Sequence, residues 1–381
     1  MNNITIKAST LTSSIQKIMG VVSRTAVDTP ELGHILLNYS KGALNMTATD
    51  MQVQLSSSIQ NVGDGDDFVT TIPGTSAFEI IRSLGEEQIE IDVSESAVRI
   101  KSPHSTFKLR SLAPNGFPLF DDTEPNTAFV VKQNNIQKLF NKTAICIGQR
   151  DIGRPYLNGI LLKVTPNTLV AVASDGNRLA KSKAIIDKAN IAEEGYLIPT
   201  KAVQEVQRLI GNNGNAKMAL SNNRAVFDIG TTTLVTKLID STFPDYTAMK
   251  QFQNLHEAIN VILDKRTLKT ALQRVLIIAK ERNYMSRIDI ENNTLTISGD
   301  NLIGEQATEA IPIEGVENKI SIGFNVKFLL DAVSAGQGEM VSLGINDTSR
   351  GSLIADPSDP ETEYVIMPLR ETAPSETTNK A

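Results

Sequence analysis

Three stretches share one pattern and decide the fold: LLNYSKGALNMTATD at residues 36–50, LLKVTPNTLVAVASD at 161–175 and IDIENNTLTISGD at 288–300. In each stretch, apolar and polar residues alternate on both sides of a turn, as is typical of an antiparallel hairpin with one buried face. The pattern ends on an aspartate each time, with two equal steps of 125 residues: Asp50, Asp175 and Asp300. A fixed period of this length predicts three copies of one folding unit.

Other markers keep the same period. Each copy opens with a short alternating run followed by an amphipathic helix, at Ile4, Phe129 and Ile259. Apolar residues three and four apart predict six helices, at residues 9–24, 74–84, 133–143, 200–210, 264–282 and 325–335. With roughly eight short strands in each copy, the sequence predicts an α+β fold of three similar domains, each with two helices packed on one face of antiparallel sheets.

Polar stretches set the expected domain boundaries. The chain has 381 residues, too many for one ordinary core, and we place the domains at residues 1–125, 126–251 and 252–370. The last segment, residues 371–381, has no large apolar residue and is rich in Pro, Ser and Thr. We expect it to be a disordered tail.

Composition excludes several classes of protein. No stretch has the ~18 to 20 consecutive apolar residues of a membrane span, and the start lacks the pattern of a secretory signal, so we expect a cytoplasmic protein with no membrane partner. Cys146 is the single cysteine, and the three histidines (His34, His104 and His256) are far apart in sequence. These residues predict neither a disulfide framework nor a metal site, and we expect no cofactor.

Charge is segregated between helices and the rest of the chain. The six predicted helices carry 14 Lys or Arg and five acids, a net charge of +9. The remainder carries 23 Lys or Arg and 38 acids, which leaves −15. If the three copies place their helices on a common side, that side attracts nucleic-acid phosphates without reading sequence.

Two other functions account for less of the sequence pattern. A nucleotide hydrolase needs a carboxylate cluster for metal or a nucleophile beside a base, and the sequence offers neither pattern. A repeat-built scaffold that never meets DNA accounts for the three copies but leaves the charge segregation without a role. Retention on DNA after charge reversal in the helices distinguishes that scaffold from a DNA-binding protein.

Five segments together resemble the bacterial DNA polymerase III sliding clamp family, its beta subunit: RPYLNGILL (154–162), ASDGNRLA (173–180), KLIDSTFPDY (237–246), GFNVKFLLDA (323–332) and YVIMPLR (364–370). The resemblance implies a homodimeric ring of two head-to-tail subunits, each of which forms half of it. Helices line the central hole and duplex DNA passes through it. It also implies a processivity factor without catalytic residues, which tethers the replicative polymerase.

The resemblance also implies site residues. A groove for short hydrophobic peptides from the polymerase III catalytic subunit, the clamp loader and other clamp-binding-motif proteins is expected at Leu157, Ser174, Gly176, Asn177, Arg178, Leu179, Pro244, Met249, Asn325, Val365, Ile366, Met367, Pro368, Leu369 and Arg370. DNA contacts are expected from the family-matched loops and the basic helices, at Arg24, Lys138, Lys142, Arg150, Arg154, Tyr156, Lys201, Arg266 and Lys269. The dimer interface is expected to pair Phe107 and Leu109 with Ile277 and Ile278.

Overall fold

The computed structural model describes the chain except for residues 1–2, 26–27, 64, 122–123, 188–192, 250–257, 315–318, 346–349 and 370–381. Arg370 and the predicted tail therefore lie outside the described residues. Within the described part, no helix is long and apolar enough to cross a membrane.

One order of elements occurs three times. The first copy runs β1 (Asn3–Lys7), α1 (Ala8–Ile18), β2 (His34–Ser40), β3 (Ala43–Thr49), β4 (Val53–Ile59), β5 (Phe68–Pro73), α2 (Gly74–Ser83), β6 (Gln88–Val93), β7 (Ala97–Lys101) and β8 (Thr106–Arg110). The second runs β9 (Thr127–Lys132), α3 (Gln133–Thr143), β10 (Gly159–Val164), β11 (Thr168–Ser174), β12 (Arg178–Ile185), β13 (Glu194–Pro199), α4 (Thr200–Leu209), β14 (Asn215–Leu220), β15 (Arg224–Ile229) and β16 (Thr232–Lys237). The third runs β17 (Ile259–Asp264), α5 (Lys265–Ala279), β18 (Met285–Glu291), β19 (Thr294–Asp300), β20 (Gln306–Pro312), β21 (Ile320–Asn325), α6 (Val326–Ala335), β22 (Met340–Ile345), β23 (Ser352–Ala355) and β24 (Thr362–Ile366). Among the residues that the structure describes, each copy has two α-helices and eight strands, and the predicted three-copy α+β architecture is confirmed.

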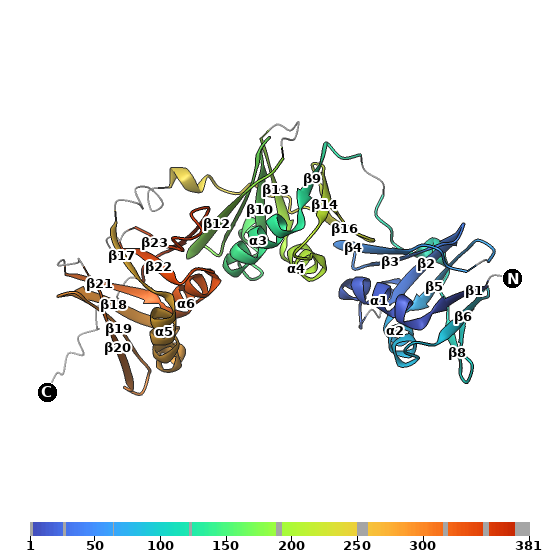
Figure 1. The fold of residues 1–381 in the computed structure, drawn as a ribbon, viewed down its shortest axis with the longest axis horizontal. Coiled ribbons are helices and arrows are strands. Elements are labelled where there is room, and N and C mark those ends of the chain that lie inside the picture. Colours follow the sequence, from blue (N-terminus) through green and yellow to red (C-terminus); the bar gives the residue numbers. More distant parts are fainter. Residues whose placement is uncertain are drawn as a thin grey trace. The chain divides into compact units, whose positions relative to one another are not determined.

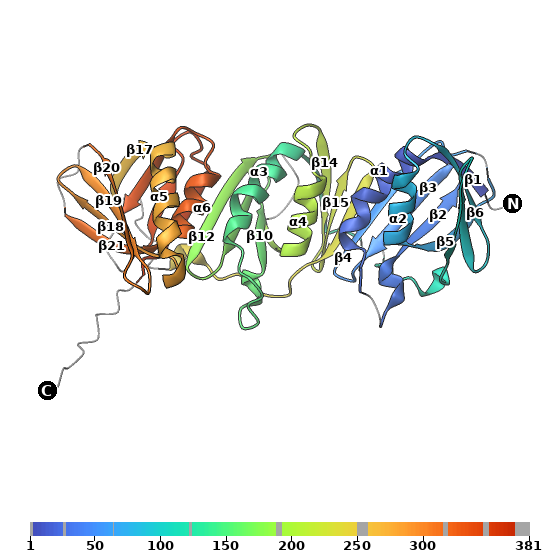
Figure 2. The ribbon, with the colours of Figure 1, turned by 90° about the horizontal axis from the view of Figure 1, so that it is seen from below.

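By its internal contacts the chain divides into two compact units, each of which combines parts of two copies. Unit 1 comprises residues 1–137, 186–191 and 198–240. It contains an eight-stranded sheet in the order β5-β2-β3-β4-β16-β15-β14-β9 and a four-stranded sheet in the order β1-β6-β7-β8. The central pair, β4 and β16, comes from different copies, so unit 1 contains a joint between the first copy and part of the second. Its helices α1, α2 and α4 lie on the same side of the sheets (Figures 1 and 2).

Unit 2 repeats this construction. It comprises residues 138–185, 192–197 and 241–381. Its eight-stranded sheet runs β13-β10-β11-β12-β24-β23-β22-β17, with the β12–β24 pair as its joint, and its four-stranded sheet runs β20-β19-β18-β21. Helices α5 and α6 cover one face of these strands (Figure 2). Counted outward from the joint, the two eight-stranded sheets have equivalent strand orders.

Alternation and helical spacing build the core of each unit. In β3, Leu44, Met46 and Ala48 are fully buried, as strand alternation predicts. In α1, Leu11 and Ile15 are buried one turn apart and face the sheet. Helix α5 has a side-chain cap at its start, because the Asp264 carboxylate accepts a hydrogen bond from the Thr267 amide at 2.7 Å.

The turn between the third and fourth strands of each copy shows that one of the three repeat markers, Asp300, was misplaced. The Asp50 carboxylate accepts hydrogen bonds from the amides of the turn, and Asp175 does the same in the second copy. In the third copy this role belongs to Asn301, whose side-chain oxygen accepts from the Ile303 and Glu305 amides at 3.2 and 2.8 Å. The equivalent of Asp50 is therefore Asn301 rather than Asp300, because β3 and β11 end one residue before Asp50 and Asp175, whereas β19 ends at Asp300 itself.

Candidate functional site

A cavity of about 190 Å³ lies in unit 2, where the second and third copies meet. It is lined by apolar and aromatic side chains with a few polar groups at its rim: Arg154, Tyr156, Leu157, Ser174, Gly176, Asn177, Arg178, Leu179, Phe243, Pro244, Tyr246, Met249 and Met367. We call this cavity the unit 2 groove. A small apolar cavity with a few fixed polar groups is suited to binding a side chain or a short peptide.

The turn between β11 and β12 shapes one wall of the groove. Asp175 fixes the turn by accepting from the Asn177 and Arg178 amides at 2.9 and 3.1 Å. Gly176 has φ +91°, and a Cβ there would stand 2.8 Å from a guanidinium nitrogen of Arg154. Any other residue at this position would be strained and would displace Arg154 from the rim.

Arg178 ties this wall to α6. Its guanidinium donates to Asp175 at 2.9 Å and to Asp331 at 2.8 Å, and it lies over the Phe328 ring at 4.2 Å. Burial by itself would lower the pKa of Arg178, but the ion pairs with the two aspartates leave its pKa above the ordinary value. Arg178 therefore stays charged, and its two ion pairs link the β11–β12 turn to α6.

Aromatic rings form the opposite wall. Phe243 contacts Tyr156 and Tyr246 edge to face, with ring centroids 5.6 and 6.3 Å apart. The Lys163 ammonium lies 5.5 Å from the centroid of Tyr246. Burial raises the pKa of the Tyr246 hydroxyl, and nearby Glu363 and Asp245 raise it further. Tyr246 thus stays a neutral, largely apolar surface at physiological pH.

The groove holds no arrangement that points to chemistry. Cys146 is buried, and burial raises the pKa of its thiol to about 12, so it is not a thiolate nucleophile. Among the residues that the structure describes, no group of acids, histidines and cysteine is placed to hold a metal ion. The observed geometry is suited to binding.

Nine of the predicted groove residues line the cavity together: Leu157, Ser174, Gly176, Asn177, Arg178, Leu179, Pro244, Met249 and Met367. Four others lie elsewhere. Val365 and Ile366 are buried in β24, Asn325 caps α6, and the Leu369 amide donates to the Gly323 carbonyl at 2.8 Å. Pro368 does not line the cavity, and Arg370 lies outside the described residues.

The cavity also contains side chains that sequence reasoning did not assign to it. Phe243 and Tyr246 were not predicted, although both stand in the KLIDSTFPDY segment that carried part of the resemblance. Arg154 and Tyr156 were expected to contact DNA, but both line the groove, and Arg154 is held by Asp151 at 2.8 Å. The two aromatic residues of the KLIDSTFPDY segment were the sequence feature from which this aromatic wall could have been predicted.

The predicted DNA-binding cations fall into two groups. Lys142 is only 4% exposed and donates from Nζ to the Ala335 carbonyl at 2.5 Å, and burial lowers its pKa. It braces α3 against the end of α6, and the expectation that it contacts DNA is corrected on this ground. Lys138 pairs with Asp359 at 2.7 Å, and Lys201 donates to the Gly20 carbonyl at 2.7 Å, but both keep about a third of their side chains exposed.

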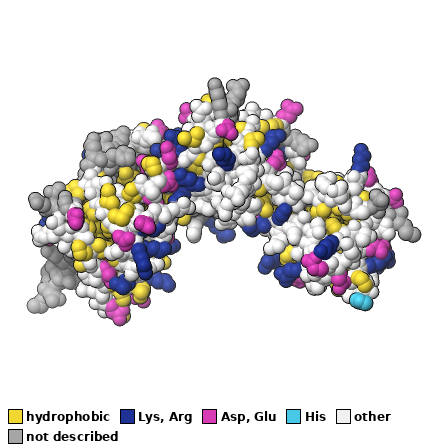
Figure 3. Space-filling model, viewed as in Figure 1, with side chains coloured by type: hydrophobic (Ala, Val, Ile, Leu, Met, Phe, Trp, Pro, Cys, Tyr) yellow, Lys and Arg dark blue, Asp and Glu magenta, His cyan; other side chains and the backbone are white. Residues whose placement is uncertain are grey.

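The second group is more accessible. Arg24, Arg150 and Arg266 are exposed, and Lys269 is half-buried. Within each unit, Lys and Arg side chains lie on the side of the helices (dark blue in Figure 3), with some Asp and Glu among them. The basic helices expected from the sequence therefore present cations on each unit.

The predicted dimer residues lie at free positions of their units. Phe107 and Leu109 are on β8, at one end of the strand order β1-β6-β7-β8, and are half-buried. On α5, Ile277 is 75% exposed and Ile278 is half-buried. An exposed isoleucine on a helix that otherwise packs against a sheet is consistent with a surface that another molecule covers.

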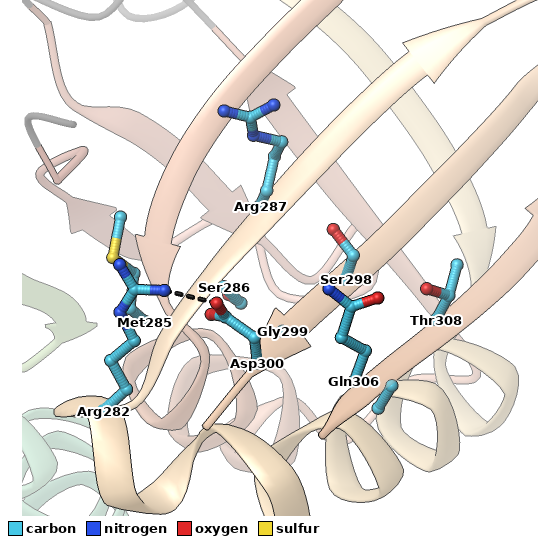
Figure 4. Close-up of a pocket in the computed structure, with 10 residues that line it drawn as sticks. Arg282, Met285, Ser286, Arg287, Ser298, Gly299, Asp300, Gln306 and Thr308 are labelled. Carbon is cyan, nitrogen blue, oxygen red and sulfur yellow. Dashed lines mark hydrogen bonds and ion pairs between the residues drawn. The ribbon is translucent and has the colours of Figure 1, made fainter. Parts of the chain in front are cut away.

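A larger hollow of about 480 Å³ lies on the outer face of the four-stranded sheet of unit 2. Figure 4 shows Ser298, Gln306 and Thr308 projecting from neighbouring strands and Arg282 paired with Asp300. Polar and apolar groups contribute almost equally to its lining, and the buried Ser286 donates from its hydroxyl to the Phe324 carbonyl. It is less suited than the unit 2 groove to binding an apolar peptide.

Family models match the chain in three consecutive parts. They are the N-terminal domain of the DNA polymerase III beta subunit at residues 2–121, its central domain at 130–245 and its C-terminal domain at 255–370. Together these matches span nearly the whole described chain.

Individual relatives agree with the family match. The chain is 30% identical to the beta sliding clamp of Pseudomonas putida over 372 residues, covering 97% of this chain and all of the relative. It is 29% identical to the beta sliding clamp of Escherichia coli, covering 90% of this chain and 92% of the relative. Among solved structures, the Pseudomonas aeruginosa sliding clamp superposes with a TM-score of 0.91 at 28% identity, covering 97% of this chain and all of that one. A Pseudomonas aeruginosa clamp bound to griselimycin superposes with a TM-score of 0.89, also at 28% identity, covering 97% of this chain and 99% of that one.

Proposed function

This chain belongs to the DNA polymerase III beta subunit family, and we propose on that premise that it acts as a DNA sliding clamp. Two copies form a ring that encircles duplex DNA without sequence specificity and tethers the replicative polymerase. The protein is a processivity factor and not an enzyme. The observation that carries this proposal is the match of all three family domains, in order, along the chain.

The unit 2 groove is the attachment point for partners in this proposal. Its aromatic wall and Leu179 offer apolar contact to a Leu or Phe side chain, and the rim turn offers backbone groups to a peptide. The partners are the polymerase III catalytic subunit, the clamp loader and other proteins with a clamp-binding motif. Because a related clamp has been solved with bound griselimycin, we choose griselimycin as the ligand for testing the groove.

DNA contact in this proposal comes from accessible cations over the helices. Arg24, Arg150, Arg266 and Lys269 are the principal contacts, with smaller contributions from the partly paired Lys138 and Lys201. Contacts of this kind follow the phosphate backbone, release counterions and carry no sequence information, which suits a protein that slides. Retention then depends on the closed ring rather than on affinity.

Ring closure in this proposal joins β8 of one copy to β20 of the other. Both strands lie at the end of a four-stranded sheet, and Phe107 and Leu109 stand on the first while Ile277 and Ile278 stand on the helix beside the second. A head-to-tail contact of this type closes when two copies complete a rotation. The domain boundaries at residues 125 and 251, and a location in the cytoplasm, are further parts of the proposal.

Griselimycin binding and polymerase stimulation test the groove. Gly176→Val places a side chain against Arg154 and strains the turn, so we expect griselimycin to bind about tenfold more weakly, about 1.4 kcal/mol, and polymerase stimulation to fall. Gly85→Val is the matched control, because Gly85 also has positive φ but nothing within 4 Å of its Cβ position. Equal binding by both variants would contradict the groove assignment.

A further inference from the structure

The joint of unit 1 contains the same turn that forms one wall of the unit 2 groove. An aspartate carboxylate fixes the β3–β4 turn as another fixes the β11–β12 turn. In unit 1, the Lys237 amide at the end of β16 donates to the Gln52 carbonyl of the turn at 3.1 Å. In unit 2, the Met367 amide after β24 donates to the Asn177 carbonyl at 2.9 Å. The two turns are therefore built into their joints in the same way.

The other two parts of the groove also have counterparts in unit 1. A short 3₁₀ helix contains Leu32 in unit 1, and another contains Leu157 in unit 2. The carbonyls of these two leucines each accept from a backbone amide at 2.8 Å. The segment FPLF at 117–120 corresponds to FPDY at 243–246, which supplies the aromatic wall of the unit 2 groove. Unit 1 thus contains a counterpart of each part of the groove.

Phe120 lies across this counterpart and is half-buried. Its amide donates to the side-chain oxygen of Gln54 at 2.9 Å, and Gln54 holds the position that Leu179 holds in unit 2. The Lys237 ammonium lies 5.3 Å from the centroid of the Phe120 ring, and Lys237 holds the position of Met367. Leu179 and Met367 both line the unit 2 groove. Phe120 therefore lies where a bound side chain would lie in unit 2.

Arg224 on β15 also contacts this segment. Its guanidinium carbon lies 5.3 Å from the centroid of the Phe120 ring, and it donates to the Asp121 carbonyl. Arg224 is 14% exposed and lies 3.8 Å from the Asp121 carboxylate, which is 95% exposed. An aromatic ring beside two cations is stabilised by cation–π attraction. The Phe120–Asp121 pair is thus held by its ring, its backbone and its acid, as a bound peptide would be.

Unit 2 lacks the side chains that hold this pair. The three positions that contact Phe120 carry other residues there: Leu179, Met367 and Gly351 stand in place of Gln54, Lys237 and Arg224. None of the three replacements carries a charge or a side-chain amide. Tyr246, the counterpart of Phe120, lies instead beside Lys163 and Phe243, with 5.5 Å from its centroid to the ammonium and 6.3 Å to the other ring. The aromatic wall of unit 2 therefore stays beside the groove and leaves it open.

We propose that unit 1 contains a second peptide site of the same construction as the unit 2 groove, and that the Phe120–Asp121 pair of the same chain is its bound ligand. The site takes an aromatic side chain followed by an acid. Because this ligand belongs to the chain, it binds intramolecularly and outcompetes a free peptide, so partners find the site occupied. The proposal goes beyond the sliding-clamp function and rests on contacts within unit 1.

Emptying and refilling the site tests this proposal. Phe120→Ala removes the bound ring, and the probe is acetyl-Pro-Leu-Phe-Asp-amide, which copies residues 118–121. In a titration followed by ligand-observed NMR, the probe should bind the variant about tenfold or more tightly than it binds the natural protein. Acetyl-Pro-Leu-Ala-Asp-amide is the matched control and should bind neither protein. Equal binding of the probe by the variant and the natural protein would overturn the proposal.

A second substitution locates the bound probe. Arg224→Gly introduces the residue found in unit 2 and removes the guanidinium that contacts both ring and acid. Added to Phe120→Ala, it should weaken probe binding about fivefold or more. Full affinity in this double variant would place the probe elsewhere and overturn the proposal. Griselimycin binding by the natural protein tests the unit 2 groove and not this site, so failures of the two proposals can be told apart.

Hydrogen exchange tests the same contacts without emptying the site. Gln54→Leu introduces the residue found in unit 2 and removes the acceptor of the Phe120 amide, so that amide should exchange about tenfold faster. The amide of Ala48, in the neighbouring strand β3, is the control and should keep its rate to within about threefold. Unchanged exchange at Phe120 would show that Gln54 does not hold the segment, and the proposal would then fail.

Discussion

A charged side chain is buried beside each of the two joints inside the chain, but the two charges have opposite signs. In unit 1, the buried ion is an acid: Glu205 is 6% exposed and is held by Arg208 at 2.7 Å and Lys201 at 3.6 Å. In unit 2, the buried ion is a cation, Lys142, which donates to the Ala335 carbonyl and lies 3.9 Å from Asp359.

The strand pairing across the two joints, in contrast, is the same. This difference teaches which features the repeat specifies. The hydrophobic pattern and the strand register recur because a one-residue slip would turn the apolar face outward. Ion networks are local, and each depends on which side chains surround it. We therefore expect substitutions to affect the two joints unequally, although the backbone is shared.

Reversing the buried cation of unit 2 should have the largest effect. Lys142→Glu would bury an acid beside Asp359 and Asp356, and we expect it to lower the free energy of unfolding by about 3–5 kcal/mol. Amide hydrogen exchange in β12 and β24 would report the loss. Lys17→Glu is the matched control at the same helix position, where a more accessible side chain should cost under about 1 kcal/mol. Equal losses would mean that the two joints do not differ in this way.

Removing the buried acid of unit 1 should have an intermediate effect. Glu205→Ala leaves Arg208 and Lys201 without their carboxylate, but both are about a third exposed and still donate to carbonyls of the first copy. We expect about 1–3 kcal/mol of destabilisation, seen as faster exchange in β4 and β16. Glu79→Ala, at the same position of α2 and exposed, is the control. A loss as large as that of Lys142→Glu would remove the distinction.

Acid should weaken unit 2 through a carboxylate beside its joint. Burial by itself would raise the pKa of Asp356, but hydrogen bonds from the Ser358 hydroxyl and from the Gly338, Ser358 and Gln337 amides lower it to about 2. Because the folded pKa lies below the ordinary 3.8, this stabilisation is present above about pH 4 and is lost as pH falls toward 2. Asp356→Asn should flatten the pH dependence of exchange in β22 and β23 over that window. An unchanged slope would assign the acid sensitivity to other groups.

The repeat made most of the fold predictable from the sequence. Strand alternation and helical spacing are local, so the element order followed from the three stretches that end near Asp50, Asp175 and Asp300. The third marker was displaced to Asn301, because the strand before it ends 126 residues after its counterpart in the second copy and not 125, and Asp300 closes that strand. The packing into two units, each with a joint between copies, depends on pairing between distant strands and had no local signal.

The site was predictable in part. Most groove residues on the β11–β12 turn came from one motif, ASDGNRLA, and lie together in the cavity. Phe243 and Tyr246 belong to a segment far along the chain, so their place on the opposite wall required the tertiary structure. Lys142 was misassigned because a count of helix charges cannot tell which face of a helix is buried.

Retention on DNA of different topology tests the central claim most directly. The protein should be loaded by its clamp loader onto a nicked circular plasmid, separated from free protein and then treated with an enzyme that cuts the plasmid once. A ring that encircles the DNA should stay on the circular plasmid at moderate salt and should slide off once the plasmid has been cut and has ends. Protein that stays bound equally to the linear DNA would contradict the account, because it would be held by affinity and not by encirclement.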